Sequence, residues 1–375
     1  MNGNWATLWC QLAVIGLAAE GKHAPDSRQA GRNSLFDGPG GADPRAGFLL
    51  QNLIRASLRD SPVALEVEDW PPVKVIRSLG PTSGVAVDSR GLVLILHRGP
   101  VVWNASSFEQ NNVYRYQDHP IKEPTIVVLD PKTGLVVRRW AENMQVPCLL
   151  PFFMPHGLYI DPEDNVWVTD VALHQVFKFP RNATSAELVL GEAFVPGHGA
   201  DHFCKPTDVV IPPSGLVFIS DGYCNSRVAV FTPQGRHVTD LGTRDGLRVP
   251  HSLTYVERDN VVCVADRQNH RVLCFWAGSS ALDLGTPRSA IEGPLGRVYA
   301  IASVGNYMYG LQIDDRVSAA SGFRVELYPG SQIQAFTPRQ RFIQPHDLAV
   351  SDDGRILYAV DVDAANEKKV YKFRI

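Results

Sequence analysis

The sequence predicts an all-β fold, a six-bladed β-propeller with axial metal sites that runs from about residue 63 to residue 375. Three observations predict it: a Pro-His turn that returns at a fixed interval, short runs of alternating β-branched residues, and a turn-rich composition with 31 Gly and 27 Pro. The runs are typical of strands separated by Gly, Pro and Asp turns. Four strands in each period of about 45 residues indicate a propeller blade.

The overall composition narrows the function class. The 375 residues carry 36 Lys+Arg and 39 Asp+Glu, a net charge of -3, and 45% of them are hydrophobic. A chain of this composition can bury a large core, so wholesale disorder is excluded. The near-neutral charge argues against a nucleic-acid-binding protein, because phosphate recognition usually needs a basic face.

The chain begins with an apolar run that is typical of an export signal. Trp5 to Ala19 is too short to span a bilayer and is followed by a polar stretch. No Lys or Arg precedes the run, so an uncleaved anchor or a disordered start stays open. We expect a signal peptide over 1–19, a flexible leader over 20–62, and a secreted protein without a membrane span. Two glycosylation acceptors agree with secretion, at Asn104 and Asn182.

Five cysteines follow the apolar run. Cys263 and Cys274 flank a turn-like segment and can face one another on the adjacent strands of a hairpin. Cys204 and Cys224 could close a strand-turn-strand unit in the same way, which leaves Cys148 unassigned. Free buried thiols are the alternative, but an exported chain favours two disulfides.

A four-residue element recurs along the chain and divides it into units. The three copies that carry His are spaced 95 residues apart, and they read Pro155-His156-Gly157-Leu158, Pro250-His251-Ser252-Leu253 and Pro345-His346-Asp347-Leu348. Related copies lie between them, with Ser83, Thr207 and an apolar residue near Tyr299 in the His position. Together they make six units of roughly 45 to 50 residues, with one long insertion around residues 101–125.

The histidines of this element predict a metal site on the propeller axis. The first strand of each blade lines the central channel. Because His156, His251 and His346 belong to alternate blades of six, their imidazoles are expected to converge with three-fold geometry. Three His ligands with one open position are typical of catalytic zinc. The alternative is a set of histidines with structural roles only.

A second, calcium-type site is predicted beside the first. Asp347 directly follows His346, and a lone carboxylate on the axis needs a cationic partner. Backbone carbonyls from matching turns, such as those of Val85 and Leu158, could complete an oxygen shell. The alternative is that Asp347 only caps a turn.

Further motifs carry a resemblance to a known family. They include the runs Trp167 to Phe177 and Ser220 to Arg227, which read WVTDVALHQVF and SDGYCNSR. With the His element they make the chain resemble the peptidyl-α-hydroxyglycine α-amidating lyases, the second catalytic module of the bifunctional peptide-amidating enzymes, with an NHL-repeat propeller. The likeness extends from Glu66 to the C-terminus and includes no copper monooxygenase module, so it implies a free-standing lyase.

The resemblance implies a role for each matching residue. The matching positions are His156, His251 and His346 for zinc; Val85, Leu158 and Asp347 for calcium; Arg98, Tyr223 and Arg267 for catalysis and substrate binding; and Cys204–Cys224 and Cys263–Cys274 for disulfides. Gln344 stands where vertebrate relatives have Met, which we interpret as a change in the pocket lining that leaves zinc ligation intact.

The implied reaction cleaves peptidyl-α-hydroxyglycine into a peptide amide and glyoxylate, the second step of peptide α-amidation. Zinc would act as a Lewis acid on the hydroxyl, and calcium would be mainly structural. Tyr223 would be the general base, its pKa lowered by Arg267 and the metal, and Arg98 would bind the substrate carboxylate. We expect a monomer that receives α-hydroxyglycine-extended peptides from a separate peptidylglycine monooxygenase.

Two other function classes stay open. One is a non-catalytic NHL-type propeller that binds partners through one face, and the other is a calcium-dependent lactonase-like hydrolase. The first does not require three axial histidines, and the second builds its axial site from Asp, Asn and Glu. The His-rich ring therefore argues against both.

Overall fold

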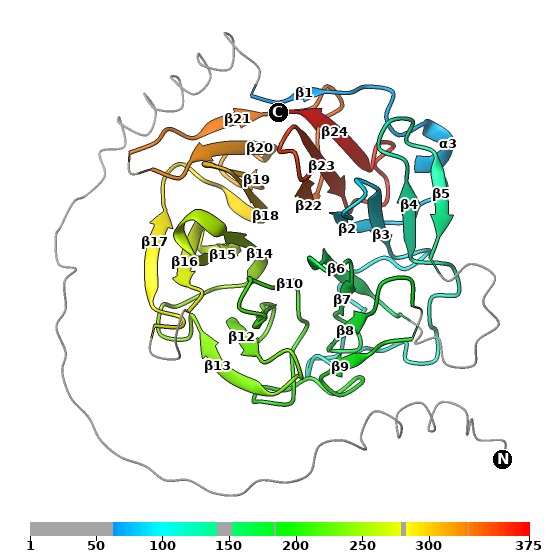
Figure 1. Cartoon of the computed structure of the whole chain (residues 1–375). Helices are drawn as coiled ribbons and strands as arrows, with labels where there is room; N and C mark the ends of the chain where they lie inside the picture. The colour runs from blue at the N-terminus through cyan, green and yellow to red at the C-terminus, as the bar shows by residue number, and fades with distance from the viewer. Residues whose placement is uncertain (1–62, 141–151, 184, 279–282, 329) are drawn as a thin grey trace, which may run out of the picture.

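Residues 63–140, 152–183, 185–278, 283–328 and 330–375 are described by a computed structural model. They form six four-stranded antiparallel sheets arranged as a ring (Figure 1), which confirms the predicted six-bladed β-propeller. The expected signal peptide over 1–19, the leader over 20–62 and Cys148 lie outside the described residues. Within the described part of the chain, no helix has the length and hydropathy needed to cross a membrane.

In each blade the first strand is innermost and the last is outermost (Figure 1). Blade 1 contains β2 (Thr82–Val87), β3 (Val93–His97), β4 (Ile126–Leu129) and β5 (Val136–Arg139). Blade 2 contains β6 (Pro155–Ile160), β7 (Val166–Asp170), β8 (Gln175–Phe179) and β9 (Leu188–Leu190). Blade 3 contains β10 (Asp208–Val210), β11 (Val217–Asp221), β12 (Arg227–Phe231) and β13 (His237–Leu241).

The second half of the ring repeats this order. Blade 4 contains β14 (Pro250–Val256), β15 (Val261–Asp266), β16 (Arg271–Trp276) and β17 (Pro287–Ile291). Blade 5 contains β18 (Arg297–Val304), β19 (Tyr307–Asp314), β20 (Ala319–Glu326) and β21 (Gln334–Phe336). Blade 6 contains β22 (Pro345–Val350), β23 (Ile356–Asp361), β24 (Val370–Arg374) and β1 (Leu65–Glu66). The described helices are short: α3 (Val73–Ile76) and the 3₁₀ turns η2 (Glu257–Asp259) and η3 (Arg267–Asn269).

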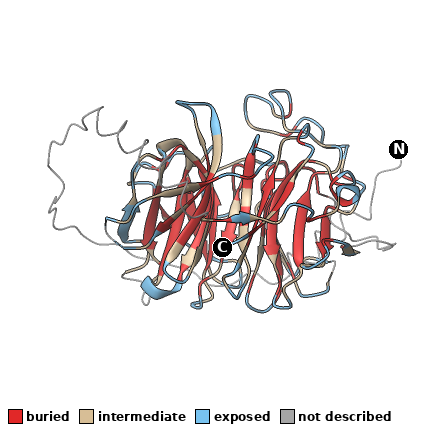
Figure 2. Cartoon of the chain, turned by 90° about the horizontal axis from the view of Figure 1, so that it is seen from above, coloured by how far each residue is buried: buried red, intermediate tan, exposed pale blue. Residues whose placement is uncertain are grey.

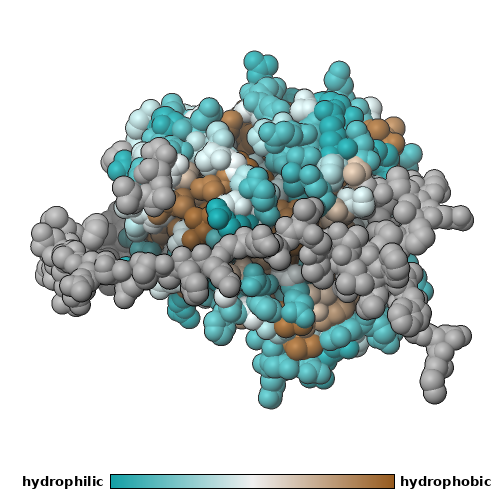
Figure 3. All heavy atoms as spheres, turned by 60° about the horizontal axis from the view of Figure 1, so that its bottom comes forward, coloured by the Kyte–Doolittle hydropathy of each residue, from teal (hydrophilic) through white to brown (hydrophobic). Residues whose placement is uncertain are grey.

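The apolar cores lie between neighbouring blades. The second strands β3, β7, β11 and β15 are buried at every position, because both faces of each strand pack against another blade. Leu94 of blade 1 and Phe177 of blade 2, for example, belong to one buried cluster. Exposed residues gather in the loops at the two ends of the strands (Figure 2). On the face shown in Figure 3, hydrophobic atoms form small areas between hydrophilic ones.

A buried acceptor at the end of each second strand positions the loop that enters the first strand of the same blade. Asp170, for example, accepts hydrogen bonds from the backbone N–H groups of Phe153 and Met154, directly before the first residues of β6, Pro155 and His156. Equivalent acceptors in the other blades are Asp221, Asp266, Gln312, Asp361 and the Nδ1 atom of His97. The strand-ending Asp that repeats in the sequence is therefore a structural anchor for the residues that face the axis.

The last blade is completed by the start of the described chain. The order β1-β24-β23-β22 places Leu65 opposite Arg374. Glu66 fixes this closure, because its carboxylate pairs with Lys368 and accepts a bond from the N–H of Arg339 at 2.8 Å. Both side chains of the ion pair are largely buried, at 8% and 12% exposed.

We predict that Glu66→Ala lowers the free energy of unfolding by about 1–3 kcal/mol, because it removes the carboxylate that pairs with the largely buried ammonium of Lys368 and accepts the N–H of Arg339. Chemical denaturation measures the loss. Glu68→Ala is the matched control, since Glu68 is 51% exposed in its ion pair with Arg339 and such surface pairs contribute about 0–1 kcal/mol. Equal losses in the two variants would contradict a role of Glu66 in closing the ring.

Candidate metal centre and active site

Three histidines meet on the axis. His156, His251 and His346 are the second residues of β6, β14 and β22 and are 1%, 2% and 6% exposed. Their ring centroids are 4.6 to 4.9 Å apart, and one nitrogen from each lies within 4.8 Å of the other two. The structure therefore brings together the residues that the 95-residue spacing singled out.

Each of these rings is oriented by a hydrogen bond to the next blade. Nδ1 of His156 lies 2.9 Å from the carbonyl oxygen of Thr207, and the same bond joins His251 to Tyr299 and His346 to Ser83 at 2.7 Å. A carbonyl only accepts, so every Nδ1 carries the proton. In a neutral ring this leaves the lone pair on Nε2.

The three carbonyls come from the other three blades at the same position of the repeat. Ser83 and Thr207 were expected there, and the predicted apolar residue of the fifth unit is Tyr299. Its ring also packs against His251 at a centroid distance of 5.4 Å. Around the axis, successive blades thus present in turn an imidazole donor and a backbone carbonyl acceptor.

The histidines are held in the neutral form. Burial lowers the pKa of His156 and His251 well below the usual value, and it lowers the pKa of His346 to about 3. The positive charges of Arg98 and Arg267 act in the same direction. Neutral imidazoles with Nε2 lone pairs directed at one another are the form in which histidine binds a metal.

These residues fit a bound cation. Three acceptor nitrogens converge, and the hydroxyl of Tyr223 lies 3.2 Å from Nε2 of both His156 and His251. A phenol has one proton and can satisfy only one of these nitrogens. A metal ion that prefers nitrogen ligands would satisfy all three, and a three-His set is a zinc type. The identity of the metal stays a prediction.

Tyr223 is held beside the histidines by its neighbours in the chain. It lies in the turn between β11 and β12, where the Cys204–Cys224 disulfide follows it and Gly222 precedes it. A Cβ atom on Gly222 would lie 2.0 Å from the carbonyl oxygen of Pro250. Only glycine therefore lets this turn approach β14 closely enough to place the phenol at His251.

Arg267 lowers the pKa of Tyr223, as the sequence predicted, but burial outweighs this effect, and the lowering expected from a metal stays a prediction. Desolvation raises the pKa of Tyr223 more than the guanidinium groups of Arg267 and Arg98 lower it. Without a bound cation, the phenol of Tyr223 is thus protonated at neutral pH. A further positive charge at the histidines would act with the two arginines to favour the phenolate.

Arg98 and Arg267 hold equivalent positions in opposite blades. Arg98 follows His97 of β3, Arg267 follows Asp266 of β15, and each donates its backbone N–H to the loop before the first strand. Blades 1 and 4 lie opposite one another in the ring of six blades. The sequence assigned both arginines by resemblance, and the repeat explains why they approach the axis together.

Arg98 is a buried cation with an unused donor. It is 3% exposed, its Nε donates to the carbonyl of Pro155 at 3.0 Å, and its Nη2 is buried without a hydrogen-bond partner. Burial lowers the pKa of Arg98 to about 10, so the group is charged at neutral pH. An unsatisfied guanidinium beside the histidines is suited to a carboxylate.

Arg267 lies beside Tyr223 and Tyr299. Its guanidinium carbon is 5.3 Å from the ring centre of Tyr223 and 5.0 Å from that of Tyr299, and Nη1 is 3.5 Å from the Tyr223 hydroxyl. Its Nε is also buried without a partner. Two guanidinium groups thus give the site a positive potential.

Two carboxylates, those of Asp208 and Asp347, line a small pocket together with the three histidines. Asp347 accepts the N–H of Val85, and Asp208 accepts the N–H of Leu253, at 2.9 and 2.8 Å. Burial raises the pKa of both, and the charge of Asp208 raises that of Asp347 further. In a strand the C=O of a residue points to the same side as its N–H, so the carbonyl of Val85 also faces Asp347. Such an oxygen-rich site fits a hard cation.

Asp208 is a residue of this site that the sequence analysis did not assign. Its signal was its place directly after Thr207, which matches Asp347 after His346. Asp208, Leu158 and Asp347 also line a cavity of about 970 Å³. Val85 lines the same cavity, so all three predicted calcium residues lie there with one carboxylate more than the sequence assigned.

The other predicted residues are placed as follows. Both predicted disulfides, Cys204–Cys224 and Cys263–Cys274, are present. Asn104 and Asn182 are exposed, although Thr184 of the second acceptor lies outside the described residues. Gln344 has an exposed side chain, and its N–H donates to Asp361.

Trp103 is a site residue that the sequence did not reveal. It lies in the insertion between β3 and β4, yet its ring centre is 4.8 Å from that of Tyr223 and 6.3 Å from that of His156. No repeat position marks it. Only the path of the insertion brings it to the histidines.

Comparisons with known proteins agree with the fold and the motifs. A family model described as NHL repeat matches residues 152–179, 203–231 and 247–275. The PQQ-bound aldose sugar dehydrogenase of Streptomyces coelicolor aligns over 79% of this chain and 94% of its own, with a TM-score of 0.52 and 13% identity. At that identity the likeness shows the fold alone.

Two relatives found by sequence are much more similar to this chain than that structural neighbour. Peptidyl-alpha-hydroxyglycine alpha-amidating lyase 2 of Drosophila melanogaster is 36% identical over 319 residues, which cover 83% of this chain and 76% of the relative. Peptidyl-glycine alpha-amidating monooxygenase A of Xenopus laevis is 39% identical over 334 residues, 84% of this chain and 34% of the relative. The chain therefore spans about a third of the length of the Xenopus protein.

We predict that His156→Ala, His251→Ala and His346→Ala each lose most of the zinc bound by the purified protein, because three equivalent nitrogens hold one ion. Elemental analysis after dialysis measures the metal content. His237→Ala is the control, since His237 lies in β13 and pairs with Asp240. A variant of the three that keeps full zinc content would remove its histidine from the ligand set.

Proposed function

The chain belongs to the peptidyl-alpha-hydroxyglycine alpha-amidating lyase family, and from this premise we propose that it cleaves peptidyl-α-hydroxyglycine into a C-terminally amidated peptide and glyoxylate. The observation that carries the proposal is the buried Arg98, whose Nη2 has no hydrogen-bond partner, beside three converging histidines. A small anionic head group that also offers a hydroxyl oxygen matches both features. The substrate has these two groups on one carbon.

The reaction breaks one C–N bond and moves, in net terms, one proton from the hydroxyl to the departing nitrogen. The hydroxyl proton of the α-hydroxyglycine leaves, the C–O bond becomes the C=O of glyoxylate, and the C–N bond breaks with its electrons passing to nitrogen. That nitrogen takes up a proton and becomes the terminal amide. No water, oxidant or reductant is consumed, so the site needs only a proton carrier and positive charge.

The side chains of the site divide this work. Arg98 binds the carboxylate through its free donor and orients the head group. Zinc held by His156, His251 and His346 would act as a Lewis acid toward the hydroxyl. Tyr223 takes the hydroxyl proton and can return it to the departing nitrogen, while Arg267 stabilises the phenolate form.

We infer a supporting role for calcium at Asp347, the carbonyls of Val85 and Leu158, and Asp208. A cation there would balance the two carboxylates and join blades 1, 2, 3 and 6 where the channel is otherwise open. We also infer that the protein is secreted and receives its substrates from a separate peptidylglycine monooxygenase. Two disulfides support an oxidising compartment.

The direct test is incubation of purified protein with an N-acyl-α-hydroxyglycine while glyoxylate is measured. Release of glyoxylate supports the lyase. Turnover of a lactone without glyoxylate release would favour the lactonase-like hydrolase, and no turnover of either substrate by zinc-containing protein would favour a binding propeller.

We predict that Arg98→Lys lowers kcat/KM about ten- to a hundredfold, because an ammonium cannot keep the bond to Pro155 and also grip a carboxylate with a planar fork. Steady-state kinetics of glyoxylate release measure the change. The charge is retained, so zinc content should match the wild type. An unchanged kcat/KM would show that Arg98 does not contact the substrate.

We predict that Tyr223→Phe lowers kcat by about 10²–10⁴-fold, because loss of a general base has this effect. Only the phenolic oxygen is removed, so the packing of the ring against Trp103 persists and the melting temperature should change little. Zinc analysis and thermal unfolding are the controls. A near-normal kcat would leave Tyr223 as a wall of the pocket.

A further inference from the structure

The insertion between β3 and β4 brings one large aromatic side chain over the proposed reaction centre. The ring centre of Trp103 is 4.8 Å from that of Tyr223, and the guanidinium carbon of Arg98 is 5.7 Å from the Trp103 ring. Trp103 is partly exposed. It therefore contacts both the carboxylate-binding residue and the proposed base, and still presents apolar surface to solvent.

The insertion is held in place by a buried lysine. Nζ of Lys205 donates to Oδ1 of Asn112 at 2.8 Å and lies 4.1 Å from the ring centre of Phe108, which packs against Trp103 at 5.3 Å. Lys205 is only 8% exposed. Asn112 also offers its carbonyl to Nε2 of His174, 3.1 Å away. Blades 2 and 3 thus fix the tip of the insertion.

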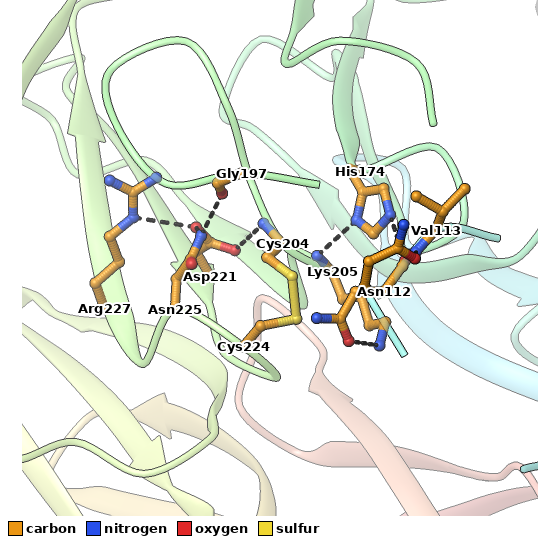
Figure 4. Close-up of a disulfide and its surroundings, with 11 residues drawn as sticks. Asn112, Val113, His174, Gly197, Cys204, Lys205, Asp221, Cys224, Asn225 and Arg227 are labelled. Carbon is orange, nitrogen blue, oxygen red and sulfur yellow. Dashed lines mark hydrogen bonds and ion pairs between the residues drawn. A yellow bond between two sulfur atoms is a disulfide. The ribbon is translucent and has the colours of Figure 1, made fainter. Parts of the chain in front are cut away.

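The same short segment fixes Tyr223. Lys205 directly follows Cys204, and the disulfide from Cys204 reaches Cys224, the neighbour of Tyr223 (Figure 4). Figure 4 shows the lysine and the disulfide side by side, with His174 and Asn112 beyond the lysine. The segment Cys204–Lys205 therefore restrains both Trp103 and Tyr223.

We propose that Trp103 is a specificity-determining residue that contacts the acyl group preceding the α-hydroxyglycine, with Lys205 and Asn112 as positioning residues. This inference rests on the proposed lyase function. The head group is small, and its carboxylate and hydroxyl are taken by Arg98 and the histidine–Tyr223 cluster. The rest of the peptide is attached to the amide nitrogen and then extends past the indole of Trp103, which lies against Arg98 and Tyr223.

An indole presents a broad apolar face and stacks on other rings. The substrate class this wall favours is peptides whose last retained residue has an aromatic or other large apolar side chain. Substrates with a small group at that position gain nothing from the indole. Selectivity would therefore appear as a lower KM for the bulky acyl group, with similar kcat.

The test compares two substrates, N-benzoyl-α-hydroxyglycine and N-acetyl-α-hydroxyglycine, by glyoxylate release. In Trp103→Ala we expect KM for the benzoyl substrate to rise about tenfold, KM for the acetyl substrate to change less than about threefold, and zinc content to stay at the wild-type level. Trp103→Phe should give an intermediate ratio. Val102→Ala, a 48% exposed neighbour in the same insertion, is the control and should leave the ratio unchanged.

The positioning role of Lys205 and Asn112 is tested by Asn112→Gly. This change removes the side-chain acceptor of Lys205, and glycine tolerates the backbone angle φ of 69° at this position. We expect it to shift the benzoyl-to-acetyl KM ratio in the same direction as Trp103→Ala, and Lys205→Met should do the same. A ratio that stays at the wild-type value in both Trp103 variants overturns the contact with Trp103. If Trp103→Ala fails to fold, Trp103→Phe decides.

The outcomes separate this inference from the function on which it rests. If the wild type releases glyoxylate from neither substrate, the lyase proposal fails. If the wild type cleaves both and the Trp103 variants lose activity equally on both, the lyase stands and the specificity role is overturned. If the benzoyl-to-acetyl KM ratio changes in the Trp103 variants but not in Asn112→Gly, only the positioning role of Lys205 and Asn112 is rejected.

Discussion

The structure depends on one ring of hydrogen bonds between neighbouring blades. Each axial histidine donates its Nδ1 proton to the backbone carbonyl of the residue in the same position of the next blade. Because a carbonyl cannot donate, the bond settles the tautomer and turns every Nε2 lone pair toward the axis. The same three contacts therefore join blades 2 to 3, 4 to 5 and 6 to 1 and set the geometry of the three nitrogens.

A second set of contacts links this ring to the cores of the blades. The acceptors at the ends of the second strands, such as Asp170 and Asp266, hold the loops that deliver the axial residues. Arg98 and Arg267 directly follow two of these acceptors, His97 and Asp266, in opposite blades. An arginine in this position has a rigid backbone and loses little freedom when it binds an anion.

The six-fold scheme alone would produce a nearly symmetric channel, and two additions make it one-sided. The disulfide-braced turn carries Tyr223 to two of the three histidines, and the insertion carries Trp103 over Tyr223. Lys205 and Cys204 join both additions to blade 3. A nearly symmetric scaffold thus acquires a site in which Tyr223 and Trp103 lie together beside the histidines.

The sequence by itself determined the number of blades, the three histidines and the disulfide of the fourth blade. A residue that returns at equal spacing in a repeating unit is carried to equivalent positions by rotation, and hairpin register puts Cys263 opposite Cys274. Only the tertiary structure decided that Leu65–Glu66 closes blade 6, that Trp103 covers the site and that the pKa of Tyr223 is raised. The physical reason is that strand closure, the path of a long insertion and desolvation depend on groups from several blades at once, and no spacing along the chain records which of them will meet.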